Sequence, residues 1–327
     1  MFVSYLNPPN MKKSFLYFSA VIISASTMLM SCTKDEDTTP TPGNNNPPAQ
    51  SIAAIAQADT AFSFLVTALS RAELVATLNG SGTFTVFAPT NAAFRSSGIS
   101  LEAINSLPVA DLTRILLYHV LGAKVEAAQV TTGYVNTLAA GPVTNTNLSA
   151  YVSTASGVRI NNAASVVRAD IQATNGVIHV IDRVLLPADL ATLAGVNVNL
   201  STVIGAVATA NLTNALVYDP SSTDLLTLFA PENNAFTVSG LDLGAVSVND
   251  LTNILLYHVV SGNIRSSAVT TASVPTLNTS ANLNVVVNGG VITINPGSGT
   301  TNNAGVVTAD VQGTNGVMHI INRVLVP

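Results

Sequence analysis

The chain has 327 residues and a formal net charge of −5; 48% of its residues are hydrophobic and only 9% are charged. The length suggests about two domains, and the composition excludes a charge-rich disordered chain. Because the sequence contains no basic run, we expect no nucleic-acid partner.

The first 31 residues predict a signal peptide. Met11 and two lysines precede an apolar stretch over residues 14–30. A transmembrane helix is the alternative, but the stretch is short for a span and contains Ser and Thr. A signal that begins at Met11 is more typical than one that begins at Met1, so both remain candidate starts.

The sequence LMSC (residues 29–32) ends in the only cysteine of the chain and resembles a bacterial lipobox, with Met30 as a departure. This resemblance implies lipidation of Cys32; the alternative is an incidental cysteine in an ordinary signal peptide. The next residues, TKDED (33–37), resemble the export signal of Bacteroidetes surface lipoproteins, or a charged linker. We therefore expect a lipid-anchored, surface-exposed protein of the outer membrane, whose residues 32–50, rich in Pro, Asn and Thr, form a disordered tether.

The rest of the chain repeats itself. Three phrases occur twice in the same order: FTVFAPTNAAF (84–94) and LTLFAPENNAF (226–236), DLTRILLYHVL (111–121) and DLTNILLYHVV (250–260), and NGVIHVIDRVLLP (175–187) and NGVMHIINRVLVP (315–327). Each repeat is long enough to fold as a domain. We expect domains over 51–187 and 199–327, and the short, partly apolar connection 188–198 favours packing of one domain on the other.

Each copy predicts the same local elements. Residues 106–122 predict a helix, with Pro108 in its first turn and Gly122 as its C-cap, that places His119 on the apolar face. Asn175-Gly176 and Asn315-Gly316 predict two-residue hairpins, followed by central strands that carry His179 and His319. The first phrase predicts a strand that ends at a proline and a helix capped by Thr90 or Asn91; in the second copy Asn233 remains as the cap.

Together, the phrases TVFAPTNAAF, YHV and NGVIHVIDRVLLP resemble the fasciclin (FAS1) domain in both copies. The resemblance implies an α+β fold: two tandem domains, each a wedge of twisted β-sandwich with several helices packed on it. It also implies candidate adhesion residues, because animal members carry contact motifs at these positions. In this chain they are Asp170, Ile171, Asp310 and Val311, and the Tyr-His pairs Tyr118-His119 and Tyr257-His258.

Each candidate site also has a structural interpretation. An aspartate close to a hairpin can bond the backbone of the turn, and Tyr and His can bury their rings while bonding their polar tips. All four histidines lie in the repeated phrases, and we interpret them as hydrogen-bonded structural residues. A zinc site needs three or four ligands, and the sequence has no second cysteine and no HExxH motif. We expect no metal, cofactor or catalytic residue.

The function expected from this pattern is adhesion: binding of a cell-surface protein, matrix protein or polysaccharide by two linked modules. A non-catalytic scaffold or accessory subunit of a cell-envelope complex is the alternative. A glycan hydrolase is disfavoured, because glycosidases need paired carboxylates and no pair occurs in both copies.

Overall fold

The computed structural model describes residues 50–217, 219, 224–296 and 303–327. The predicted signal peptide, Cys32 and the tether up to residue 49 lie outside these residues. Residues 47–327 form one compact unit. Within the described part, no single helix is long and apolar enough to cross a membrane; the helical pair Ile52–Ala58 and Thr60–Arg71, bent by 102°, meets that criterion only when both are counted together.

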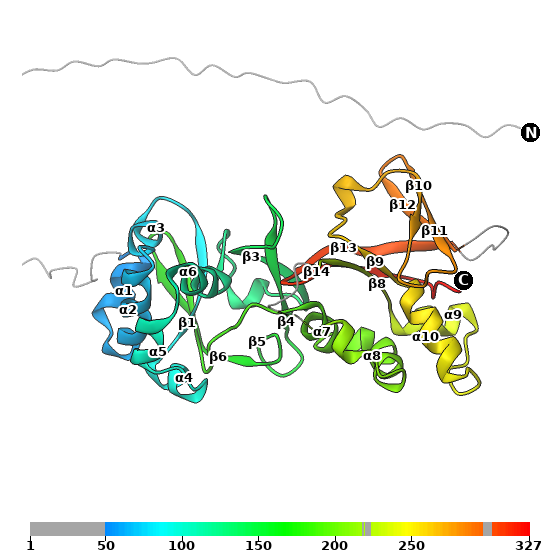
Figure 1. The fold of residues 1–327 in the computed structure, drawn as a ribbon. Helices are drawn as coiled ribbons and strands as arrows, with labels where there is room; N and C mark the ends of the chain where they lie inside the picture. The colour runs from blue at the N-terminus through cyan, green and yellow to red at the C-terminus, as the bar shows by residue number, and fades with distance from the viewer. Residues whose placement is uncertain (1–49, 218, 220–223, 297–302) are drawn as a thin grey trace, which may run out of the picture. The chain divides into compact units, whose positions relative to one another are not determined.

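Each copy builds one seven-stranded sheet with the same strand order (Figure 1). The order is β2-β1-β7-β6-β5-β4-β3 in the first copy and β9-β8-β14-β13-β12-β11-β10 in the second. Among the described strands, β1 pairs with β7 and β8 with β14 in parallel, and the other neighbouring strands pair antiparallel. The strands are β1 (Phe84–Pro89), β2 (Val120–Leu121), β3 (Gly133–Ala140), β4 (Asn147–Ser153), β5 (Arg159–Ile160), β6 (Ala164–Ala173), β7 (Gly176–Ile181), β8 (Leu226–Pro231), β9 (Val259–Ser261), β10 (Ala272–Pro275), β11 (Asn282–Asn288), β12 (Val291–Pro296), β13 (Ala304–Gly313) and β14 (Gly316–Ile321).

Helices pack on the central strands of each sheet. The predicted central strand β7 is confirmed: all six of its residues are buried, and the same holds for β14. The helices are α1 (Ile52–Ala58), α2 (Ser63–Arg71), α3 (Val75–Asn79), α4 (Asn91–Ser96), α5 (Leu101–Ser106), α6 (Val109–Tyr118), α7 (Leu190–Gly195), α8 (Ser201–Thr209), α9 (Asn233–Ser239) and α10 (Val248–Tyr257), with short 3-10 turns η1 (Thr60–Phe62), η2 (Ala127–Gln129), η3 (Val198–Leu200), η4 (Thr213–Ala215) and η5 (Ser266–Ala268).

The predicted helix at 106–122 exists but is shorter than expected. Pro108 is the N-cap of α6, and the helix ends at Tyr118, so Gly122 is not its C-cap. His119 takes the C-cap position instead, and the chain turns at once into β2. The helix stops here because the imidazole of His119 bonds the closing segment at Leu185 and the following residues pair with β1.

The hairpin turns are shifted by one residue from the prediction. Ala173 pairs with Gly176, so Thr174 and Asn175 form the turn and Gly176 opens β7. Gly176 has φ +149°, and a Cβ there would lie 1.9 Å from the carbonyl oxygen of Phe84. The glycine is therefore needed for the close approach of β1 and β7, and not for the turn.

Asn175 holds the same hairpin to the helices. Its side-chain oxygen accepts a hydrogen bond from the backbone N–H of Ile52 at 2.9 Å, and its amide donates to the carbonyl of Leu78 at 2.6 Å. Asn315 repeats the arrangement with Leu190 and Leu216. This asparagine is therefore an architectural residue that ties two helical segments to the centre of the sheet.

The strand–turn–helix prediction for the first phrase is confirmed in the first copy. Thr90 caps α4 by accepting a hydrogen bond from the N–H of Ala93. The prediction that Asn233 caps the second helix is wrong. Asn233 lies inside α9 and bonds the N–H of Thr202 and the carbonyl of Val198. The asparagine thus ties two helices together, a role that its repetition in both phrases signals but that capping rules do not describe.

The connection between the copies is part of the fold. Residues 190–195 form α7, whose Leu190 and Leu193 are fully buried. The second copy uses α7 as the first copy uses α1, because the N–H of Leu190 bonds Asn315 just as the N–H of Ile52 bonds Asn175. The second structural repeat thus begins close to residue 188, ahead of the predicted 199.

The two sheets are separate, but the hydrophobic core is not. Each copy has a cluster of its own, whereas the largest cluster contains buried residues of both, among them Leu148 and Val311. This finding corrects the expectation of two self-contained globules and confirms that the copies pack on each other. The N–H of Gln312 also donates to Ser149 Oγ across the contact at 2.9 Å.

The side chain of Gln312, which bonds only residues of the second copy, provides a test of the packing around it. Its side chain is 2% exposed and bonds Asn263, Gly313 and Gly316. Gln312→Ala is expected to lower the free energy of unfolding by about 2–3 kcal/mol, because buried polar partners lose their bonds. The equivalent change in the first copy, Gln172→Ala, removes an exposed side chain and should cost less than about 0.5 kcal/mol. Urea denaturation of both variants measures the difference; equal losses would contradict the packing described.

Candidate functional site

The two Tyr-His pairs lie inside the protein. Tyr118 is fully buried; its hydroxyl donates to the carbonyl of Ser149 at 2.8 Å and accepts from Asn161 at 2.9 Å. Burial raises the pKa of Tyr118 to about 12. Tyr257 is equally buried and donates to the carbonyl of Asn282. The burial contradicts a direct contact role for these tyrosines and matches their structural interpretation.

His119 and His258 link a helix end to the closing segment of each copy. His119 Nδ1 lies 2.8 Å from the carbonyl of Ile115, to which it donates, and Nε2 accepts the N–H of Leu185 at 2.9 Å. His258 makes the equivalent bonds at the same distances. Burial lowers the pKa of both histidines to about 4, against a smaller opposing effect of the backbone hydrogen bond. Both imidazoles are saturated and 2% exposed, so neither can contact a partner or act as a base.

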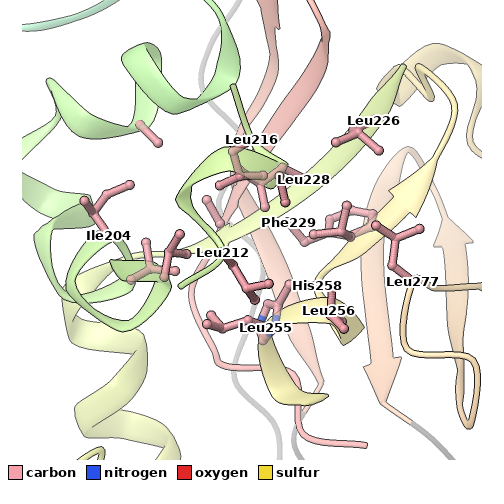
Figure 2. A pocket seen from close by; sticks show the side chains of 16 residues that line it. Ile204, Leu212, Leu216, Leu226, Leu228, Phe229, Leu255, Leu256, His258 and Leu277 are labelled. Atoms are coloured by element: carbon pink, nitrogen blue, oxygen red, sulfur yellow. The ribbon is translucent and has the colours of Figure 1, made fainter. Parts of the chain in front are cut away.

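The space beside His258 is a packing gap. Figure 2 shows the apolar side chains around it, including Leu212, Phe229 and Leu255. Its volume is about 40 Å³, and the equivalent gap beside His119 has about 20 Å³. Such volumes are far below those of small-molecule sites, and the apolar lining offers a water molecule few hydrogen-bond partners. We therefore assign no ligand to either gap.

The second pair of histidines supports a strained bulge in the sheet. Strand β6 shifts register on both sides of Arg168, and Asp170 has φ +60°, a conformation that costs free energy in a residue other than glycine. The N–H of Asp170 points to His179 Nδ1 at 3.3 Å, while Nε2 donates to the carbonyl of Val125 at 2.9 Å. The carboxylate of Asp170 in this bulge accepts a hydrogen bond from the N–H of Ala127, at 2.9 Å.

The bulge recurs in the second copy with a tighter carboxylate. Asp310 has φ +61° and accepts hydrogen bonds from the N–H and the hydroxyl of Ser266, with Arg265 at 3.6 Å. His319 is stacked on Phe229, and burial, as the largest cause, lowers its pKa. Neither aspartate bonds a hairpin turn as the sequence had predicted. Each instead accepts a hydrogen bond from the first residue of a 3-10 turn, Ala127 or Ser266.

The residues that follow the two aspartates differ in exposure. Ile171 is only partly buried, and the side chain of Asp170 is 41% exposed. Val311 is 2% exposed because it lies in the hydrophobic cluster shared by both copies. The predicted Asp310-Val311 contact motif is therefore contradicted at Val311, while the Asp170-Ile171 motif remains accessible.

No group of three or more His, Cys, Asp or Glu side chains that could hold a metal ion occurs among the described residues. The four histidines do not converge on shared acidic partners either: the one ion-pair distance in which a histidine takes part joins His179 and Asp170, at 4.0 Å. In the part of the chain that the structure describes, the positions of the four histidines therefore fit hydrogen-bonded structural residues better than metal ligands.

The Fasciclin domain model matches residues 60–187 and 198–327. The chain belongs to the fasciclin family. It therefore contains tandem fasciclin domains of mixed α and β structure, as the resemblance predicted. The matched segments contain both seven-stranded sheets and leave out α1 and α7, the helix that opens each structural repeat.

Relatives of known sequence lie in bacteria and animals. Protein sll1483 of Synechocystis is 41% identical over 143 residues, which cover 42% of this chain and 74% of that protein. Uncharacterized protein sll1735 of the same organism is 38% identical over 138 residues, which cover 41% of this chain and 96% of that protein. Transforming growth factor-beta-induced protein ig-h3 of Sus scrofa is 29% identical over 76% of this chain, which spans 35% of that protein.

Among solved structures, a fasciclin domain pair of the insect cell adhesion molecule fasciclin I matches 81% of this chain and 96% of its own, with 19% identity and a TM-score of 0.47.

Proposed function

We propose that this protein is a surface-anchored adhesion or binding protein, in which the first fasciclin domain presents the contact surface. Fasciclin domains occur in adhesion-related proteins, and one matched relative is Fasciclin-1 of Drosophila melanogaster. The ligand class is a cell-surface protein, a matrix protein or a polysaccharide. The protein acts by presentation and carries out no catalysis.

The difference in exposure between the two bulges carries this proposal. A contact residue must be reachable, and the strained Asp170 with its partly exposed Ile171 meets that condition. The second domain places Val311 under the first domain, so it cannot offer the same surface. One ligand site for each chain follows, and avidity comes from several chains on one surface rather than from the two domains of one chain.

A matched pair of substitutions tests the proposal. Asp170→Asn keeps an oxygen that can accept the N–H of Ala127 but removes the negative charge, and Asp310→Asn does the same in the second domain. We expect Asp170→Asn to weaken binding to an array of matrix proteins and polysaccharides by about tenfold or more, because bonds to charged groups are worth about 1.5–3 kcal/mol. Asp310→Asn also removes the charge that faces Arg265 and changes the oxygen that accepts the hydroxyl of Ser266, but these contacts lie within the second domain, so it should bind like the native chain. Equal binding by both variants and the native protein would refute the proposed surface, and failure of the native protein to bind any member would favour the scaffold function.

We further propose that lipid on Cys32 holds the protein at the outer membrane, with residues 33–50 as a tether. The lipobox-like LMSC sequence and the acidic residues after it support this proposal. Cys32→Ala is expected to release the protein from the membrane fraction into the soluble fraction. Cell fractionation with immunoblotting measures the shift, with Ser31→Ala as a control that should stay in the membrane; retention of Cys32→Ala at the native level would contradict the anchor.

A further inference from the structure

The second domain contains a cavity of about 320 Å³ beside the strained bulge. The buried residues of its lining are Phe229, Val260, Val285 and His319, and Ala268 and Ala272 are exposed residues of its rim. This volume falls in the range of small-molecule sites, far above the gaps beside the other histidines. An apolar space of this size exposed to water is unfavourable unless a ligand fills it.

Of the three polar residues in the lining, Thr270 is exposed, while Asn263 and His319 already have partners. Asn263 exchanges two hydrogen bonds with Gln312, at 2.8 and 3.2 Å. His319 donates to the carbonyl of Ile264 and accepts the N–H of Asp310. A ligand therefore finds branched aliphatic walls and little free hydrogen-bonding capacity, which favours a hydrocarbon over a sugar or a peptide.

The features that form this cavity belong to the second domain. Strand β12, which contributes Ile292, has six residues, whereas its counterpart β5 has two. On the rim, Asn263 and Ala268 take the positions that Lys124 and Gln129 hold in the first domain. Lys124 there forms an ion pair with Glu126 at 3.0 Å. A longer wall and a smaller, less polar rim thus distinguish the second domain.

We propose that this cavity binds a single hydrocarbon chain, the acyl chain of a fatty acid or of a membrane lipid, and leaves its polar end in the solvent. The unbranched chain fits a narrow space between aliphatic side chains, and its polar end needs no partner in the lining. The site is independent of the adhesion surface proposed above, which lies on the first domain.

A chain-length series tests the site in the full chain. Displacement of the fluorescent probe 1-N-phenylnaphthylamine by linear carboxylates from hexanoate to tetradecanoate measures relative affinity. Each added methylene that enters the cavity should tighten binding about fourfold. The increase should level off once the cavity is full, whereas adsorption to an apolar surface or segment would continue to increase with length. An increase without a plateau, or no displacement at all, overturns the proposal.

Two substitutions locate the binding. Ala268→Phe places a ring at the rim and should weaken dodecanoate binding at least tenfold, while Ser267→Phe, at the neighbouring exposed position outside the lining, should leave it unchanged. Thermal melting of both variants checks that each is folded. Equal affinities in Ala268→Phe and the native protein would overturn the proposal, as would equal losses in both variants.

Lysophosphatidylcholine with a twelve-carbon acyl chain, about the length of dodecanoate, distinguishes the two sources of the hydrocarbon chain. Competition as strong as that of dodecanoate assigns a membrane lipid, and weaker competition assigns a free fatty acid.

Discussion

Gly176→Ala is expected to destabilise the protein by about 3 kcal/mol or more, the largest effect of a single methyl group in this chain. The added Cβ would lie 1.9 Å from the carbonyl oxygen of Phe84, and the backbone there has φ +149°. Neither atom can move without separating β1 from β7, the parallel pair at the centre of the sheet. Gly316→Ala should have the same effect in the second domain, where the contact is with Leu226 at 2.0 Å.

Urea denaturation measures the loss, and Gly205→Ala is the matched control. Gly205 lies inside α8, and a Cβ added there would meet no atom within 4 Å, so alanine should stabilise the helix by about 0.5–1 kcal/mol. A loss below about 1 kcal/mol in Gly176→Ala would show that the strands can separate, and would remove the explanation given for this glycine.

The second large effect is loss of stability in acid. The pKa of His119 and of His258 falls from 6.5 to about 4 on burial. The unfolded chain therefore binds protons at higher pH than the folded chain does. Their contribution to stability is complete above pH 6.5 and is lost as the pH falls towards 4. Each histidine should account for a loss of about 3 kcal/mol over that interval.

Urea denaturation at pH 7, 5.5 and 4 measures this slope, and His119→Gln isolates one of the two contributions. The variant should be less stable than the native protein at pH 7, since glutamine cannot reproduce both hydrogen bonds. Between pH 7 and 4, however, it should lose about 3 kcal/mol less. The same slope in the variant and the native protein would show that His119 does not titrate as its burial requires.

The local elements were predictable because short-range rules decide them. The strand of β7, the helix of α6 and the cap by Thr90 follow from hydrophobic pattern and capping chemistry. The errors lie where long-range contacts compete with these rules. Gly122 looked like a helix end, but the helix stops earlier because His119 bonds the closing segment. Asn175-Gly176 looked like a turn, but the glycine is needed by a neighbouring strand.

The candidate site was predictable only as a set of repeated residues. Repetition identified both aspartates and all four histidines, yet it could not show that the Tyr-His pairs are buried. It also could not show that Val311 is buried. The two copies of the motif are nearly identical, and the burial comes from the first domain, which packs on the second. The left-handed conformation of Asp170 was not predicted, because aspartate is enriched in that conformation but adopts it at only a small share of its positions.

The central claim is that His119 and His258 hold the fold in a neutral, hydrogen-bonded state. Imidazole nitrogen NMR of the native protein between pH 7 and 4 tests this claim most directly. The account predicts that His119 and His258 keep the proton on Nδ1 and remain neutral down to about pH 4. Protonation of either histidine near pH 6.5 in the folded protein would contradict it.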